Sequence, residues 1–219
     1  KYDEAMNAAD NIMSFKLAVK SIADKHGLHA TFMPKPIYGI AGSGMHINMS
    51  LCKDGKNAFY DKDDENGLSK IAYNFIAGVI LHAKAMTGIT NPIVNSYKRL
   101  VPGFEAPVHI AWSAKNRSPL LRIPAARGEG TRIELRNPDP SANPYLALAV
   151  CLAAGLDGIK RNLTPPPQID SNVFKMTESE RESKGIENIP QNLAKAIRAM
   201  KRDNIINKTL GNHAFEKYI

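Results

Sequence analysis

The sequence predicts an α+β domain built around an antiparallel sheet. Three long segments place apolar residues at helical spacing, and two shorter segments alternate polar with apolar residues. These helices and strands do not follow the βαβ rhythm of a parallel sheet. Only about five strands are found along the chain, so we expect that partner strands of this sheet lie outside it.

The first two helices are predicted from apolar stripes and from the residues that end them. The first stripe stops before Gly27, a suitable glycine cap, and consists of Met6, Ala9, Met13, Leu17 and Ile22. The second helix is expected over residues 68–87, with Gly88 as its stop. Its apolar side carries Ile71, Phe75, Ile76, Val79 and Ile80.

A third helix and a polar tail complete the helical part. The third helix is expected over residues 144–161, with Asn143 as its N-cap and a proline at its first position. Because it is apolar on nearly every face, we expect it to be buried in a larger body. Residues 164–219 are predicted to be a peripheral, mainly helical tail, with a capping box at 177–180 and a helix over about 190–202.

Two strands with one polar face each are predicted from period-two alternation. The first, over residues 44–51, carries on that face Gly44, His46, Asn48 and Ser50. The second, over residues 132–136, carries Arg132, Glu134 and Arg136. Each strand therefore places polar groups on one side of the sheet and apolar groups on the other.

The composition excludes several classes of protein. With 43% hydrophobic and 23% charged residues, the 219-residue chain has the profile of a soluble globular protein and not of a disordered one. No apolar run approaches the ~20 residues needed to cross a bilayer, so we expect a cytoplasmic protein without a membrane partner. The two cysteines, Cys52 and Cys151, have no neighbours at zinc-ligand spacing.

The formal net charge of +8 is concentrated where arginine outnumbers lysine. Between Lys98 and Arg136 the chain has eight Lys/Arg and three Glu. Arginines embedded in Pro-, Gly- and apolar-rich segments favour bidentate binding of carboxylate or phosphate in a site. A nucleic-acid surface is more often lysine-rich or interleaved with aromatic residues, so we expect no nucleic-acid partner. The series consists of Arg99, Arg117, Arg122, Arg127, Arg132 and Arg136.

His46 and Glu134 are candidate ligands of a divalent cation. A histidine and a carboxylate on adjacent strands can hold Mg²⁺ or Mn²⁺ near phosphates. Two plainer interpretations stay open. His46 can be a half-buried histidine satisfied by a neighbour, and Glu134 can be neutralised by Arg132 and Arg136 in a salt-bridge ladder.

A loop bracketed by Pro and Gly, residues 101–107, presents Glu105. Such a loop is suited to move as a flap over a site, although a surface loop with a solvated glutamate is the alternative. The chain has neither G-x-x-x-x-G-K-[ST] nor G-x-G-x-x-G, so a bound nucleotide would need a different cradle.

Five motifs occur in order: ATFMPKP at 30–36, GSGMH at 42–46, NSYKRLVPGFEAP at 95–107, NRS at 116–118 and RIELR at 132–136. Together they resemble the C-terminal portion of the catalytic domain of bacterial type I glutamine synthetase. The similarity runs from the first helix to the C-terminus. It implies the glutamine synthetase/guanido kinase-like fold, in which a curved antiparallel sheet packs against helices.

The resemblance also implies a reaction and its partners. Members of the family make glutamine from glutamate, ammonia and ATP through a γ-glutamyl phosphate intermediate, and they use Mg²⁺ or Mn²⁺. A homododecamer is the assembly it implies for a full-length protein.

Roles for individual residues follow from the same resemblance. It implies His46 and Glu134 as metal ligands, and as nucleotide ligands Asn48, Ser50, Arg117, Arg122 and Arg132. It implies as glutamate ligands Gly42, through its backbone, with Arg99, Arg117 and Arg136. Glu105 would close over the site and help to accept the ammonium proton, so the catalytic residues would be Glu105 and Arg117.

The sequence departs from the family at several positions. Ala41 stands where the family usually has an asparagine that touches glutamate, which removes a donor and an acceptor. Arg127 and Glu129 lie in a loop of different shape and receive no role. Phe174 falls near a tyrosine that certain bacterial members adenylylate, so we do not expect that control.

The N-terminal β-grasp domain and the early catalytic segment of the family are not found in this sequence. We therefore expect residues 1–219 to be a partial catalytic domain that is inactive alone, although its parent would be a glutamate–ammonia ligase. Two other hypotheses remain. One is a related ligase that joins glutamate to another amine, as Ala41 could signal, and the other is a non-catalytic nucleotide-binding or assembly fragment.

Overall fold

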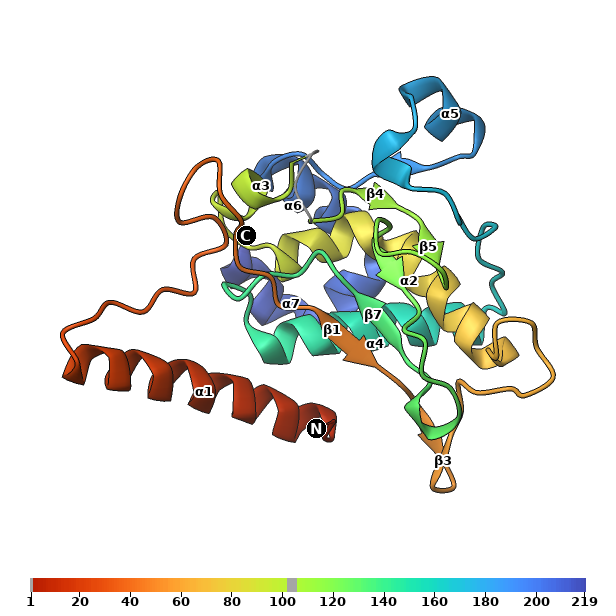
Figure 1. Ribbon diagram of the computed structural model, residues 1–219, viewed down its shortest axis with the longest axis horizontal. Helices are drawn as coiled ribbons and strands as arrows, with labels where there is room; N and C mark the ends of the chain where they lie inside the picture. Colours follow the sequence, from red (N-terminus) through yellow and green to blue (C-terminus); the bar gives the residue numbers. More distant parts are fainter. Residues whose placement is uncertain (1, 102–105) are drawn as a thin grey trace.

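The computed structural model describes residues 2–101 and 106–219 and is mixed α and β (Figure 1). Its helices are α1 (Ala5–Lys25), α2 (Lys70–Thr90), α3 (Ser96–Arg99), α4 (Pro144–Lys160), α5 (Glu178–Ser183), α6 (Leu193–Lys201) and α7 (Asn204–Tyr218), with 3₁₀ turns η1 (Gly128–Gly130) and η2 (Val173–Lys175). Its strands are β1 (Ile47–Met49), β2 (Cys52–Lys53), β3 (Lys56–Asn57), β4 (His109–Ile110), β5 (Trp112–Ser113), β6 (Leu121–Arg122), β7 (Ile133–Leu135) and β8 (Glu187–Asn188). The predicted α+β class is confirmed.

The main sheet has the strand order β1-β7-β6-β5. Two of its three pairings are antiparallel, as predicted, but β5 and β6 run parallel. The register places Glu134 opposite Asn48 on one side and opposite Arg122 on the other. The predicted alternation holds, since Ile47 is buried between exposed His46 and Asn48. Both predicted strands are shorter than expected, because regular pairing covers only the three central residues of each.

Helices α2 and α4 form the hydrophobic core together with the apolar face of the sheet. Ile133 and Leu135 of β7 belong to the same buried cluster as Phe75 and Val79 of α2 and Val150 of α4. The predicted N-cap of α4 is confirmed, because the Asn143 side chain accepts from the amides that follow it. The prediction for the end of α2 was wrong. The helix continues through Gly88 to Thr90, where the glycine lies close to Met200 of α6.

The tail contributes to this core. Ala196 and Met200 of α6 and Ile206 of α7 are completely buried. The capping box at Thr177 and Glu180 is confirmed at the start of α5. Helix α7, which the sequence did not predict, packs on α4 and α2.

Helix α1 lies at the side of the body in Figure 1, where it contacts α4, and an extended segment follows it. Its helical character is confirmed, but its apolar stripe is not buried. Ala9 is the only buried residue of the helix, whereas Met6 and Leu17 are 66% and 69% exposed. Among the described residues the helix touches the body through Lys16, whose ammonium donates to the carbonyl of Pro140, and through a hydrogen bond between Asp10 and Tyr145.

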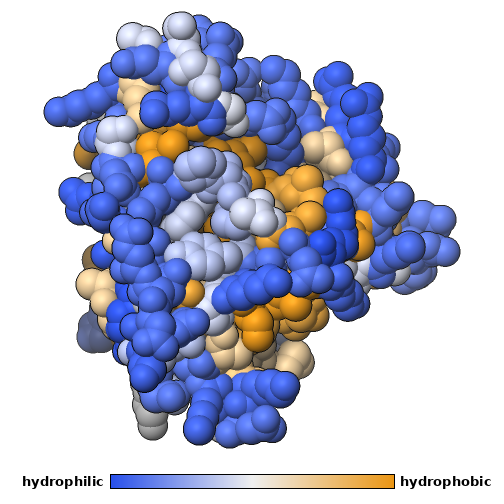
Figure 2. Space-filling model, turned by 90° about the vertical axis from the view of Figure 1, so that its right-hand side faces the viewer, coloured by the Kyte–Doolittle hydropathy of each residue, from blue (hydrophilic) through white to orange (hydrophobic). Residues whose placement is uncertain are grey.

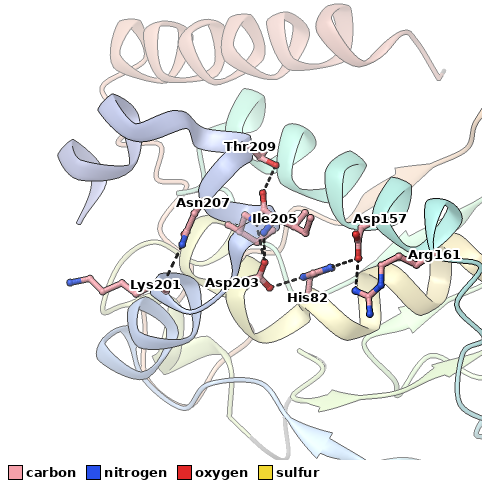
Figure 3. A network of polar contacts seen from close by, with 9 residues as sticks. His82, Asp157, Arg161, Lys201, Asp203, Ile205, Asn207 and Thr209 are labelled. Atoms are coloured by element: carbon pink, nitrogen blue, oxygen red, sulfur yellow. Dashed lines mark hydrogen bonds and ion pairs between the residues drawn. The ribbon is translucent and has the colours of Figure 1, made fainter.

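A buried histidine ties three helices together (Figure 3). The two ring nitrogens of His82, on α2, lie 2.6 Å from a carboxylate oxygen of Asp203 and 3.1 Å from one of Asp157. Asp203 is the N-cap of α7, and Asp157, on α4, also accepts from Arg161. Because ionised carboxylates only accept hydrogen bonds, this arrangement favours the form of His82 with a proton on both nitrogens. His82 therefore joins α2, α4 and α7 through its two ring nitrogens.

In the part of the chain that the structure describes, no helix has the length and hydropathy to cross a membrane.

Candidate functional site

Three neighbouring strands bring the predicted metal ligands and one arginine together. His46 directly precedes β1, Glu134 is the middle residue of β7, and Arg122 ends β6. The Nδ1 atom of His46 lies 2.8 Å from Oε1 of Glu134, and the Arg122 guanidinium donates to Oε2 at 3.0 Å. The carboxylate is therefore engaged through both of its oxygens. Only the sheet register creates this cluster, because the three residues are far apart in sequence or on different strands.

The environment of Glu134 shows which arginines neutralise its carboxylate, a point that the sequence left open. The residue is only 7% exposed, so its charge must be balanced by neighbours. The ion-pair partners are Arg122, across the strand pair, and Arg136, whose Nε atom is 3.8 Å away. Arg132 takes no part in this pairing. Its Nε atom donates instead to Asn48 Oδ1 at 3.0 Å.

His46 is held in the form that a metal requires. Burial of the ring and the charges of Arg136 and Arg99 lower the pKa of His46 below its ordinary value, although Glu134 acts in the opposite direction. The imidazole is therefore neutral near pH 7, which is the state in which histidine ligates metals.

The pair of donors fits part of a divalent-cation shell. Neighbouring ligands of an octahedral ion at ~2.1 Å are ~3 Å apart, close to the separation of the His46 nitrogen and the Glu134 oxygen. Within residues 2–101 and 106–219, however, no three His, Cys, Asp or Glu side chains form a group that could hold a metal. These two residues therefore supply a fraction of the ligands, and water, phosphate or other protein groups must supply the rest.

Two of the three predicted glutamate-binding arginines, Arg99 and Arg136, are the most buried of the series. Arg99 and Arg136 are each 6% exposed. The Arg99 guanidinium donates to the carbonyls of Asn137 at 2.6 Å, Pro138 at 3.3 Å and Arg136 at 3.4 Å. Arg136 donates to the carbonyl of Arg117. Both side chains thus brace the backbone around the end of β7.

A buried polar cluster behind this strand was not predicted. Asn91, Asn137 and Asp139 are almost completely inaccessible and bonded to one another, with Asn91 Nδ2 2.9 Å from Asp139 Oδ2 and Asn137 Nδ2 2.8 Å from Asn91 Oδ1. Asparagine and aspartate are usually surface or turn residues, and only their placement after α2 and β7 reveals the cluster.

The remaining predicted residues lie on the strands of the sheet or in the segments next to them, and they differ in exposure. Arg117, Asn48 and Ser50 are exposed, and Arg122 and Arg132 are half-buried. Gly42 lies against the carbonyl of Pro34, which a Cβ atom would approach to 2.1 Å, so glycine is needed there. Ala41 precedes it on the surface. The predicted flap residue, Glu105, lies outside the described residues.

The loop between β6 and β7 is held by side chains to which the sequence assigned no role. Arg127 donates to three backbone carbonyls, and Asn57 to two more. In the sequence, the one indication of a role for Arg127 was its position between two other arginines of the series.

A groove of about 640 Å³ lies away from this cluster. It is lined by the loop that precedes α2, the segment that follows α4, and Tyr73 and Trp112. Figure 2 shows the face at the right of Figure 1, on which apolar patches are surrounded by hydrophilic side chains. None of the predicted site residues that the structure describes lines the groove. We therefore place the candidate site at the sheet, where the charged groups converge.

Comparison with known proteins identifies close relatives. Residues 1–219 match a family described as the glutamine synthetase catalytic domain. Glutamine synthetases from Clostridium saccharobutylicum and Staphylococcus aureus are 64% and 56% identical over all 219 residues, and the chain spans about half (49%) of their length. Two solved structures, a GmaS/ADP complex and GmaS without ligand, superpose on this chain with TM-scores of 0.89 and 0.88, and both are 42% identical to it in sequence. The superposition covers the whole of this chain and 51% and 50% of the two GmaS chains.

Proposed function

Since the chain belongs to the glutamine synthetase family, we propose that the full-length protein is an ATP-dependent ligase that joins ammonia to glutamate. The observation that carries this proposal is the cluster of His46, Glu134 and Arg122 on three adjacent strands. It combines a neutral imidazole, a buried carboxylate and a cation that can face a phosphate.

The reaction that fits this chemistry has two steps. A γ-carboxylate oxygen of glutamate attacks the γ-phosphorus of ATP, and ADP leaves to give γ-glutamyl phosphate. Ammonia then attacks the acyl carbon, phosphate leaves, and one proton passes to a base. In the first step negative charge concentrates on the transferring phosphoryl group, so preorganised cations are the main contribution that a protein can make.

The residues of this chain divide these tasks. Arg122 and Arg132, one at each end of the β6–β7 loop, and exposed Arg117 would bind the phosphates, and Asn48 and Ser50 would contact the nucleotide. Arg117 would also contact glutamate while the phosphoryl group is transferred to it from ATP.

His46 and Glu134 would hold Mg²⁺ or Mn²⁺, which when bound offsets phosphate charge. Gly42 would meet glutamate through its backbone, and Arg99 and Arg136 would bind its carboxylates. Glu105 would shield the acyl phosphate and accept the proton.

An assay of the full-length protein tests this function. We expect ADP release that requires glutamate, ammonia and a divalent cation together. A protein that released no ADP under these conditions would not be a glutamine synthetase. We further propose a homododecamer in the cytoplasm, which light scattering and cell fractionation test.

A second candidate is a ligase that joins glutamate to a different amine. Ala41 supports it, because it lies beside Gly42 and lacks the amide expected there. The same assay with a panel of amines separates the two, since ADP release with another amine and none with ammonia favours the second. Binding of Mn²⁺ and ATP by calorimetry, without turnover for any amine, would favour a non-catalytic nucleotide-binding module.

A further inference from the structure

We propose that Arg127 is a positioning residue, which fixes the loop that carries the two phosphate-binding arginines. This loop, residues 123–131, is called here the arginine loop, because Arg122 directly precedes it and Arg132 directly follows it. The proposal rests on the nucleotide-binding role proposed above for Arg122 and Arg132.

The contacts of Arg127 point to the backbone. Its Nε atom donates to the carbonyl of Asn66 at 2.6 Å, and its Nη1 atom donates to those of Pro124 at 2.5 Å and Ala126 at 2.9 Å. Two of these carbonyls belong to the arginine loop, and the third belongs to the segment that leads into α2. A guanidinium that is bonded in this way joins two segments that lie about 60 residues apart in sequence.

Other side chains complete the support of the arginine loop. The Asn57 amide nitrogen donates to the carbonyls of Glu129 at 3.0 Å and Thr131 at 2.8 Å. Arg132 Nη1 donates to the carbonyl of Gly130 at 3.1 Å. Five carbonyls of a nine-residue loop are thus bonded by side chains, and Arg127 supplies the anchor for its first half.

The anchor point itself is firmly held. Asp64 accepts from the amides of Asn66 and Leu68 and from the hydroxyl of Tyr73 at 2.9–3.0 Å, which ties the segment to α2. Gly67, next to Asn66, has a φ of +66°, and a Cβ atom there would approach Arg127 Cδ to 2.7 Å. The Arg127 side chain therefore occupies the space that any other residue at 67 would need.

This support affects function through preorganisation. Arg122 and Arg132 are half-buried, and each holds a defined partner, Glu134 and Asn48 respectively. Cations that are fixed before the nucleotide binds do not lose further conformational entropy when it arrives. Releasing the arginine loop should therefore weaken nucleotide binding more than glutamate binding.

The test uses the full-length protein and three substitutions, two at Arg127 itself and one at the neighbouring Gly67. Arg127→Met keeps the length of the side chain and removes its donors, Arg127→Lys keeps one donor, and Gly67→Ala displaces Arg127 without changing it. Arg198→Met on α6 is the matched control, because its guanidinium is exposed and remote from the loop. The Kd for ADP with Mn²⁺ is measured by calorimetry, and KM for ATP and for glutamate by ADP release.

We expect Arg127→Met to raise the Kd for ADP and the KM for ATP by about tenfold, with KM for glutamate changed less than about twofold. Arg127→Lys should recover part of the loss, and Gly67→Ala should shift the Kd in the same direction. An equal loss for both substrates, or an unchanged Kd for ADP in Arg127→Met and Gly67→Ala, would overturn the proposal. If the wild type binds ADP but joins no amine to glutamate, the proposed ligase fails, whereas the Kd comparison still decides the role of Arg127.

Discussion

Replacement of His82 should loosen the C-terminal helix in a pH-dependent way. The side chain is 7% exposed, and both nitrogens face carboxylates. Breaking a buried ion pair costs roughly 3–5 kcal/mol. The cost is smaller here, because Asp157 would still accept from Arg161, and Asp203 would still accept from two backbone amides of α7. We therefore expect His82→Gln to reduce the free energy of opening of α7 by about 2 kcal/mol, which accelerates amide exchange about 30-fold.

The sign of the pH effect follows from the three pKa shifts. Although burial opposes charging, the hydrogen bonds to Asp203 and Asp157 raise the pKa of His82 above its ordinary value. The stability that His82 contributes is complete below about pH 6.5 and is lost as the pH rises through the raised pKa. Burial by itself would raise the pKa of Asp157 and Asp203. Their hydrogen bonds to His82 outweigh burial, so the pKa of each carboxyl is lowered. Their contribution is lost as the pH falls below about 4.

Hydrogen exchange of residues 204–218, followed by mass spectrometry between pH 5.5 and 9 and corrected for intrinsic rates, measures this effect. The difference between wild type and His82→Gln should be largest at the acid end and shrink towards pH 9. His213→Gln, an exposed histidine beyond the kink that interrupts α7 at Gly211, is the control and should leave exchange unchanged. A difference that stays constant with pH would refute the charged state of His82.

Three further results are expected. Glu134→Gln should weaken Mn²⁺ binding by at least about tenfold in calorimetry of the full-length protein, and an unchanged affinity would remove Glu134 from the metal shell. Asn143→Ala should lower the free energy of unfolding by about 1 kcal/mol, because α4 loses its N-cap; an unaltered denaturant midpoint would contradict that role. Burial raises the pKa of the Cys151 thiol to about 12, whereas Cys52 is exposed, so alkylation of the native protein at pH 8 should modify Cys52 alone. Equal labelling of both cysteines in peptide mass spectrometry would show that Cys151 is accessible.

Local chemistry was predictable wherever neighbours in sequence decide it. The N-cap at Asn143 and the capping box at Thr177 depend on a side chain and an amide two or three residues away. The alternation around Ile47 and Ile133 follows from the period of a strand. These features also indicated which strand face carries the polar groups of the candidate site.

Features set by contacts between distant segments could not be predicted in the same way. Gly88 does not end α2; it lies inside the helix, where Met200 of neighbouring α6 leaves little room for a side chain. The apolar stripe of α1 has the right spacing for burial, but only Ala9 is covered by the rest of the described chain. Amphipathicity therefore predicted a helix and not the partner of its apolar face.

The sequence by itself determined the family, the α+β class, and the placement of His46 and Glu134 on polar strand faces. It could not distinguish arginines that face a ligand from those that brace the backbone, because all six belong to similar local surroundings. The tertiary structure shows which of them brace the backbone, whether or not they also meet a ligand, since Arg99 and Arg127 donate to carbonyls of segments remote in sequence. The physical reason is that a guanidinium takes its role from the acceptors that the fold brings within reach.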